Sequence, residues 1–168
     1  MISLSQLNAA PAGEFVATLG GIYEHSDWVA RRVSGQRPFA SPDDLRIAML
    51  LAVEAATAEE KLGLIRAHPD LAGKLARAGA LTEESTREQA GLGLDRLSDE
   101  EFKNFSENNE RYREKFGFPF IICARLTTKQ GVLDAFAKRL ANFNEEEVSE
   151  ALRQIHEIAR LRLKDAIG

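Results

Sequence analysis

His68 stands at a place in the sequence where groups for proton transfer are often found. It lies in the segment Ala67-His68-Pro69-Asp70-Leu71, between two stretches with helical patterns. Pro69 disfavours helical backbone at His68, so the first helix is predicted to end there, and Asp70 can cap the helix that follows. Imidazole titrates near neutral pH, so a histidine fixed at such a break can act as a general acid or base. His25 is predicted to have a structural role, and His156 lacks the second histidine of a His-Glu-x-x-His zinc motif.

Three polar residues are spaced so that one face of a helix would carry them all. Ser85, Glu88 and Gln89 stand at positions i, i+3 and i+4 of the helix predicted after Thr82. Most triplets of this kind form a solvated face, whereas three polar groups that converge on a cleft would bind a polar ligand. The sequence leaves both interpretations open.

The predicted last helix carries an arginine on its apolar side. At 100° per residue, one stripe of this helix contains Val148, Leu152, Ile155, Ala159 and Ala166. Arg162 falls on that stripe, whereas Arg160 falls on the polar face. Burying an unpaired guanidinium is strongly unfavourable. Arg162 is therefore predicted either to form an ion pair or snorkel at the edge of the core, or to point into a cavity and hold an anion or a carbonyl group.

Two further residues, Asn109 and Cys123, stand out by their type. Asn109 lies within an aromatic stripe of Phe102, Phe105, Tyr112 and Phe116, and is predicted to be a core asparagine bonded to neighbouring backbone. Cys123 is the single cysteine and is predicted to pack as a small apolar residue. The sequence holds no phosphate loop, dinucleotide fingerprint, nucleophile elbow or recognisable set of metal ligands. Any enzyme activity is therefore expected to need no cofactor and no metal.

Helix signals dominate the chain and predict an all-α fold of about eight to ten helices. Capping residues at Ser41, Thr57, Thr82, Ser98, and Thr127 or Thr128 predict helices that end near residues 56, 67, 91, 116 and 142, and Asn144 opens the last helix, to about 166. Shorter helices are expected at 4–8, 13–20 and 27–33. The helix after Ser41 is apolar on nearly all sides and is predicted to lie at the centre of the fold. Residues 118–122 are the extended candidate.

Length and charge narrow the class of protein. The chain has 168 residues, a mass of 18.6 kDa and a formal net charge of −4. A single compact domain over residues 1–168 is expected. A mildly acidic chain without a basic block is a poor candidate for nucleic-acid binding, and no apolar run is long enough to span a membrane. The single cysteine and the lack of a signal-peptide pattern after Met1 predict a cytoplasmic protein.

Four segments, taken in order, resemble one enzyme family. They are Tyr23-Glu24-His25-Ser26-Asp27-Trp28-Val29, Ala67-His68-Pro69-Asp70-Leu71, Ser85-x-x-Glu88-Gln89-Ala90-Gly91-Leu92 and Asn109-x-x-Tyr112-x-x-Lys115-Phe116-Gly117-Phe118-Pro119-Phe120-Ile121. The chain is similar to the 2-oxo-4-hydroxy-4-carboxy-5-ureidoimidazoline (OHCU) decarboxylases of urate breakdown, from about Ile2 to Ile167. The resemblance implies an all-helical fold, a homodimer, no cofactor, and (S)-allantoin as the product.

The resemblance also implies roles for residues in two of these segments. His68 matches the catalytic histidine of the family, and Pro69 matches its neighbour in the pocket. Ser85 and Glu88 match a serine and a glutamate that contact the substrate, and Gln89 beside them is expected to contact it as well. Glu88 is expected to act with His68 in catalysis, by positioning either the imidazole or the hydroxyl of the substrate.

The last part of the chain supplies the remaining expected contacts. Phe120, Ile121, Ile122, Cys123 and Ala124 match the family's segment that offers backbone groups to the substrate. The family's pocket arginine lies in an Arg-Leu pair near the end of the last helix. This chain has two such pairs, and the apolar stripe selects Arg162 over Arg160. Asp27, where some relatives have proline, lies outside these positions.

Two other functions are open at this stage. One is another cofactor-free lyase or hydrolase that acts on a small heterocycle with the same histidine and glutamate. The other is a non-catalytic helical binding module, in which the buried polar residues would be structural. The second alternative predicts exposed apolar stripes and no closed polar pocket.

Overall fold

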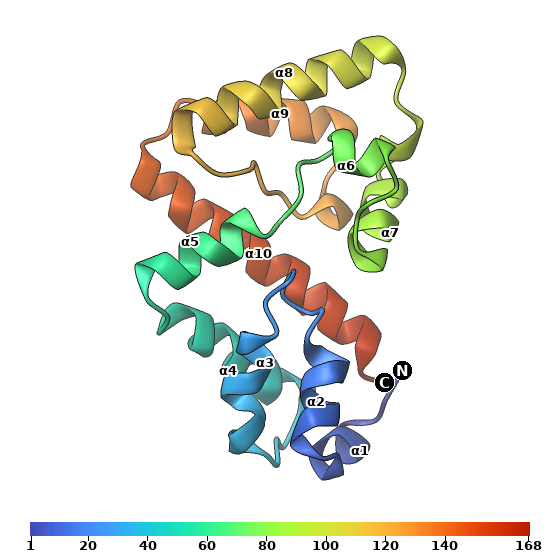
Figure 1. Ribbon diagram of the computed structural model, residues 1–168, viewed down its shortest axis with the longest axis vertical. Coiled ribbons are helices and arrows are strands. Elements are labelled where there is room, and N and C mark those ends of the chain that lie inside the picture. The colour runs from blue at the N-terminus through green and yellow to red at the C-terminus, as the bar shows by residue number, and fades with distance from the viewer. The chain divides into compact units, whose positions relative to one another are not determined.

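The computed structural model describes residues 1–74 and 76–168 and consists of helices joined by short connections (Figure 1). The chain forms two compact units, one from Met1–Ala67 with His156–Gly168 and the other from His68–Ile155. The last helix, α10 (Asn144–Ala166), contributes to both. Within the described residues the only β-structure is an isolated parallel bridge between Ile2 and Ile167. The all-α class is confirmed, while a single domain over residues 1–168 stays a prediction.

The first unit is built from the N-terminal helices and the end of α10. Its elements are α1 (Leu4–Ala9), α2 (Ala12–Leu19), α3 (Trp28–Val33), η1 (Ser34–Gln36), α4 (Pro42–Glu54) and α5 (Ala58–Arg66). Helix α3 packs against both α2 and α4, and the buried core between them includes Phe15, Val29, Leu45 and Met49. The Ile2–Ile167 bridge brings the two chain ends together, as the N and C labels in Figure 1 show.

Helix α4 differs from its prediction. Leu45, Met49 and Val53 are buried along one face, as their spacing of four residues requires. Ile47 and Leu51, on the other side, are 41% and 57% exposed. The prediction of a central, buried helix is therefore wrong, because a small unit covers only one side of this helix and the composition of the helix does not say which side.

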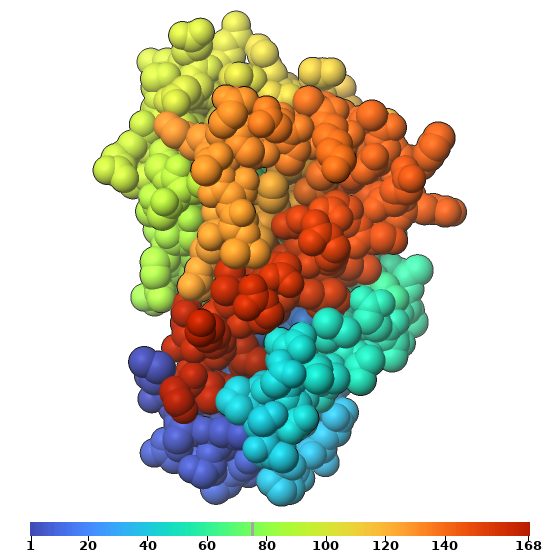
Figure 2. All heavy atoms as spheres, turned by 180° about the vertical axis from the view of Figure 1, so that it is seen from behind, coloured from blue at the N-terminus to red at the C-terminus, as the bar shows by residue number. Residues whose placement is uncertain are grey.

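The second unit has an aromatic core. Its elements are α6 (Lys74–Arg77), α7 (Glu83–Gly91), η2 (Leu94–Arg96), α8 (Asp99–Phe116), η3 (Ala124–Leu126), α9 (Lys129–Arg139) and the first turns of α10. Helices α8 and α9 lie side by side (Figure 1), and the side chains buried with them include Phe105, Tyr112, Phe118, Phe120 and Phe136. Figure 2 shows α9, in orange, beside the red-orange start of α10 on one surface of this unit.

The helix starts follow the capping residues. The side chains of Ser41, Thr57, Thr82 and Ser98 each accept a hydrogen bond from the backbone N–H three residues on. Thr128, rather than Thr127, caps α9. Helix α8 ends at Gly117, whose φ of 76° lies in the left-handed region that favours glycine. None of the helices in the described residues has the length and apolar composition that a membrane span needs.

Candidate functional site

His68 lies in a buried turn at the start of the second unit. Helix α5 ends at Arg66 and α6 begins after Gly73, so the predicted helix break at His68 is confirmed. The histidine is 7% exposed. The predicted capping by Asp70 is wrong, because the N-cap of α6 is Gly73, three residues later. The Asp70 carboxylate instead forms an ion pair with Arg113 of α8, at 2.9 Å.

Side chains from two helices hold the loop that follows His68. Gln89 of α7 accepts a hydrogen bond from the Ala72 N–H (2.9 Å) and donates one to the Asp70 carbonyl (3.3 Å). Asn109 of α8 donates to the Leu71 carbonyl at 2.9 Å, which confirms that it is a core asparagine bonded to backbone. Three consecutive residues of the loop are therefore fixed by side-chain amides.

The polar face of α7 is turned towards the interior. Ser85 and Gln89 are buried and Glu88 is half-buried, so a fully solvated face, one of the two interpretations of this triplet, is wrong. Helix α7 packs against η3, which directly follows Cys123. Gln89 connects the same helix to the His68 loop. Helix α7 is thus the element that brings the His68 loop and the end of the 120–124 segment together.

The 120–124 segment is not helical up to Cys123, whose backbone is extended, and the helical turn η3 begins at Ala124. Phe120, Ile121, Cys123 and Ala124 are buried, and Ile122 is half-buried. Two of its backbone groups already have partners within the protein. The Ile121 carbonyl accepts a hydrogen bond from Arg139 (2.5 Å), and the Cys123 N–H donates to Gln154 Oε1 (2.8 Å). These bonds fix the position of the backbone that the sequence predicts to face a substrate.

A buried ion pair holds the 120–124 segment in place. The guanidinium of Arg139 bonds the Glu147 carboxylate, with Nε at 3.0 Å and Nη2 at 2.9 Å from Oε2, and lies over the ring of Phe120, at 4.3 Å from its centre. The Tyr112 hydroxyl donates a hydrogen bond to the same carboxylate. Burial, together with this hydrogen bond, raises the pKa of the Tyr112 phenol, so the phenol stays protonated as a donor.

A groove of about 540 Å³ runs along α9 and α10 in the second unit. Its lining includes Ile122, Arg139 and Gln154, the same residues that fix the extended segment. The volume falls within the range of small-molecule sites. The groove contains charges of both signs, among them Lys138, Arg153, Glu146 and Glu150.

Arg162 lies in the first unit and is buried there, as the apolar stripe predicts. Its Nη1 forms an ion pair with Glu24 at 2.6 Å and donates to the Gly21 carbonyl at 3.1 Å. Of the interpretations that the sequence leaves open for Arg162, these contacts agree with the ion pair. Arg160 is half-exposed and pairs with Glu157 on the same helix. Its position on the polar face is confirmed.

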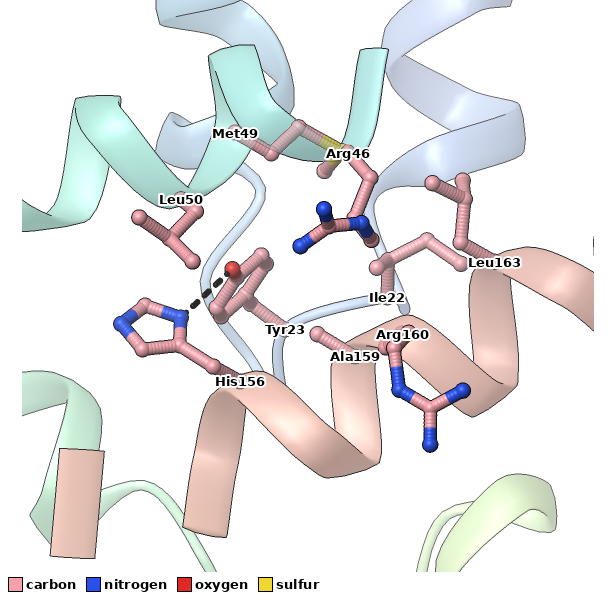
Figure 3. A pocket seen from close by; sticks show the side chains of 9 residues that line it. All are labelled: Ile22, Tyr23, Arg46, Met49, Leu50, His156, Ala159, Arg160 and Leu163. Atoms are coloured by element: carbon pink, nitrogen blue, oxygen red, sulfur yellow. Dashed lines mark hydrogen bonds between the residues drawn. The ribbon is translucent and has the colours of Figure 1, made fainter. Parts of the chain in front are cut away.

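The other two histidines, His156 and His25, lie in the first unit. His156 Nε2 lies 3.0 Å from a Glu54 oxygen and its Nδ1 lies 3.0 Å from the Tyr23 hydroxyl (Figure 3). A carboxylate can only accept, so Nε2 carries a proton, and in the neutral imidazole the Tyr23 hydroxyl donates to Nδ1. Burial raises the pKa of Tyr23, which keeps that hydroxyl protonated. His25 is exposed and adopts a left-handed backbone conformation, with φ 46°.

The cavity drawn in Figure 3 is too small for a substrate. Its volume is about 10 Å³, and its lining includes Arg46 and Arg160. A space of that size holds about one water molecule. The described residues also contain no group of three or more histidine, cysteine, aspartate or glutamate side chains placed to hold a metal ion.

Comparison with known proteins identifies the family. Residues 8–164 match the family described as OHCU decarboxylase. The chain is 42% identical over 164 residues to the 2-oxo-4-hydroxy-4-carboxy-5-ureidoimidazoline decarboxylase of Haloferax volcanii, and the match covers 98% of this chain and 95% of that protein. The chain belongs to the OHCU decarboxylase family. The resemblance seen in the four sequence segments is therefore confirmed.

Two longer proteins each contain a part that is similar to this chain. It is 40% identical over 167 residues to a uric acid degradation bifunctional protein of Bacillus subtilis, of which it spans 33%. It also resembles the crystal structure of (S)-allantoin synthase, with a TM-score of 0.81 and 32% identity. That comparison covers 100% of this chain and 54% of the other.

Sequence reasoning missed several residues that hold the predicted site residues in place. Arg139 and Glu147 lie on apolar stripes, with Phe136 and Ala151 as buried neighbours on their helices. The rule that selected Arg162 could have found both of them. Glu24 lies in a loop, where no periodic pattern exists, and Gln154 is a polar residue whose partner is a backbone N–H 31 residues away.

Proposed function

We propose that the protein decarboxylates OHCU to (S)-allantoin, a step of urate degradation. The observation that carries the proposal is the pair of hydrogen bonds between the Gln89 side chain and the His68 loop, which join this loop to α7. These bonds join the loop that follows His68 to the helix that carries Ser85 and Glu88, and they support the proposal in a chain of the OHCU decarboxylase family.

The reaction needs a site for developing negative charge and a single proton donor. When the bond between the ring carbon and the carboxylate breaks, CO₂ leaves and the electron pair enters the ring as an enolate-like anion. Hydrogen-bond donors placed where this charge develops lower the barrier. A proton must then reach the ring from one face, because its direction of arrival sets the configuration of the product.

His68 is the proposed proton donor, since imidazole can give up a proton near neutral pH. Glu88 is proposed to position the imidazole or the substrate hydroxyl, and Ser85 to hydrogen-bond the substrate. Arg162 is the proposed cation that stabilises the developing anion. The ion pair with Glu24 fixes the orientation of its guanidinium, and a preorganised donor is more effective than a mobile one.

The other predicted substrate contacts divide into two groups. Pro69 and the backbone of Phe120, Ile121, Ile122 and Ala124 are proposed to line the substrate. Gln89 was expected to contact the substrate as well, but both atoms of its amide bond the loop. The Cys123 N–H likewise donates to Gln154. For these two residues we propose that they support the site, since a substrate contact would have to replace a bond already formed.

Circular dichroism provides the direct test. Urate oxidation and hydroxyisourate hydrolysis generate the unstable intermediate, which decays to racemic allantoin without a catalyst. Added wild-type protein is expected to produce the signal of (S)-allantoin, and His68→Ala is expected to abolish it while leaving the far-ultraviolet spectrum unchanged. Racemic product from the wild type would refute the function. A rate and enantiomeric excess unchanged by His68→Ala would refute the role of His68.

We also propose a homodimer in the cytoplasm. The family resemblance supports the dimer, and the single, buried Cys123 suits a reducing compartment. Sedimentation equilibrium is expected to give twice the chain mass of 18.6 kDa, and a mass equal to one chain would contradict the dimer. Fractionation of the source cells is expected to recover the protein with cytoplasmic markers, and recovery in a secreted fraction would contradict the location.

A further inference from the structure

We infer that Asn109 is a positioning residue for His68, and that it acts through the backbone of Leu71. The inference rests on the proposed function, because it concerns the histidine proposed there as the proton donor. It adds a residue of α8 that acts on the loop rather than on the substrate.

The connection from Asn109 to His68 is short and stiff. Asn109 is 6% exposed, and its Nδ2 donates to the Leu71 carbonyl at 2.9 Å. Leu71 follows His68 by three residues, and Pro69 between them has a fixed φ. On the other side, the Ala67 N–H bonds the Gly63 carbonyl at the end of α5. A shift of the Leu71 carbonyl is therefore transmitted to the imidazole.

The loop needs such support because its backbone is strained. Ala72 has φ 51°, in the left-handed region that residues other than glycine rarely adopt. At Gly73 a Cβ would lie 2.9 Å from Asp70 Cβ, so the turn is also tightly packed. Strained backbone persists where the surrounding structure holds it. Gln89 holds Asp70 and Ala72, and Asn109 holds the residue between them.

Packing alone does not explain an asparagine at this position. Asn109 Oδ1 is buried and has no hydrogen-bond partner within the described residues. A buried acceptor without a partner is unfavourable, whereas an apolar side chain of similar size would leave nothing unsatisfied on the helix. The polar side chain is therefore explained by its one bond, to the loop that carries His68.

The first test replaces the amide with an apolar side chain of similar size. Asn109→Leu is expected to lower kcat about 10- to 100-fold with little change in KM, because a small misplacement of a catalytic group has effects of that order. When the amounts of wild type and variant are adjusted so that both give the same total rate, the enantiomeric excess of the allantoin is expected to be lower with the variant. Asn108→Leu is the matched control, since Asn108 bonds Asn104 on its own helix, and it is expected to leave kcat and enantiomeric excess unchanged.

The second test, Asn109→Asp, separates positioning from packing. A carboxylate keeps the shape of the side chain but cannot donate to the Leu71 carbonyl, whereas a protonated carboxyl can. Burial favours protonation of the new carboxyl, and Arg113, one turn along α8 and paired with Asp70, opposes it. Activity relative to wild type is expected to recover as the pH falls in Asn109→Asp and not in Asn109→Leu.

The possible results distinguish a failure of this inference from a failure of the proposed function. An active wild type with unchanged kcat and enantiomeric excess in Asn109→Leu would overturn the inference alone. An inactive wild type would refute the proposed function, and the inference with it. If Asn109→Leu does not fold, the Asn109→Asp profile decides: recovery at low pH supports the positioning role, and a flat ratio to wild type overturns it.

Discussion

The buried ion pair between Arg139 and Glu147 makes a prediction about stability that follows from burial alone. The Glu147 side chain is fully buried and that of Arg139 is nearly so. Besides the guanidinium, the carboxylate accepts hydrogen bonds from Tyr112 and from Asn142, the latter at 2.8 Å. The substitution Glu147→Leu removes the negative charge and leaves the guanidinium buried without it.

The size of the effect follows from the burial of both partners. Removing one partner of a buried pair costs about 3–5 kcal/mol, because the remaining charge is left in a medium of low polarity. A domain of this size has a free energy of unfolding of about 5–15 kcal/mol, so the loss is a large part of the total. For chains of 150–250 residues the melting temperature falls by about 2–4 °C per kcal/mol, which predicts a decrease of roughly 6–20 °C.

Urea unfolding measured by circular dichroism is the assay, and a double-mutant cycle sharpens it. Arg139→Met combined with Glu147→Leu replaces both charges with apolar groups, and is expected to be more stable than Glu147→Leu alone. The exposed pair of Arg31 and Asp27, at 2.7 Å, provides the control. Asp27→Ala is expected to change the free energy of unfolding by less than about 1 kcal/mol.

Two results would refute this reasoning. One is a loss below about 1 kcal/mol in Glu147→Leu, which would mean that the pair behaves like an exposed one. The other is a double variant whose loss equals the sum of the two single losses, because independent effects would show that the charges do not interact.

Three further predictions concern turnover, pH and the helix ends. Arg162→Ala is expected to lower kcat about 100-fold or more in the allantoin assay, because it removes a donor to the developing anion. Arg160→Ala is the control and is expected to keep a kcat near that of the wild type. Equal losses of kcat in the two variants would contradict the selection of Arg162. The hydrogen bond from the N-cap amide of α8 lowers the pKa of Glu101. The stabilisation that this hydrogen bond gives the folded protein is therefore fully present above the ordinary carboxylate pKa, about 4.3. It is lost as the pH falls through the lowered pKa. Urea midpoints measured from neutral to acidic pH are expected to fall less steeply across this window in Glu101→Gln, and identical slopes would argue against the effect. Gly117→Ala, at φ 76°, is expected to lose about 1–2 kcal/mol in urea unfolding, whereas Gly63→Ala, inside α5 with open space around it, is expected to gain about 0.5–1 kcal/mol; the reverse order would contradict the backbone argument.

Local chemistry explains why the helix starts could be predicted. Ser98 and Glu101 satisfy each other's backbone N–H groups within one turn, so this start depends on no distant residue. The same holds for Thr57 and Glu60. Asp70 shows the limit of the rule. A carboxylate near a helix start can serve as a cap, but in this protein it pairs with Arg113, which is distant in sequence.

The burial of the candidate site residues was predictable where a periodic pattern carried the signal. The apolar stripe of the last helix predicted that Arg162 is buried and that Arg160 is not, and the structure confirms this difference in burial. The partner of Arg162 was not predictable, because Glu24 lies in a loop 138 residues earlier in the chain. Likewise, the position of Asn109 in an aromatic stripe predicted that it is buried but not that it bonds Leu71.

The sequence by itself determined the helical class, the helix starts, the break at His68 and the resemblance to a family, because each depends on residues close together in the chain or on an ordered set of motifs. The tertiary structure alone decided which polar groups meet. Side-chain amides from α7 and α8 reach the His68 loop, and a buried pair holds Ile121. The physical reason is that a hydrogen bond across 17–38 residues depends on how helices pack, and the spacing of residues within one helix does not encode that packing.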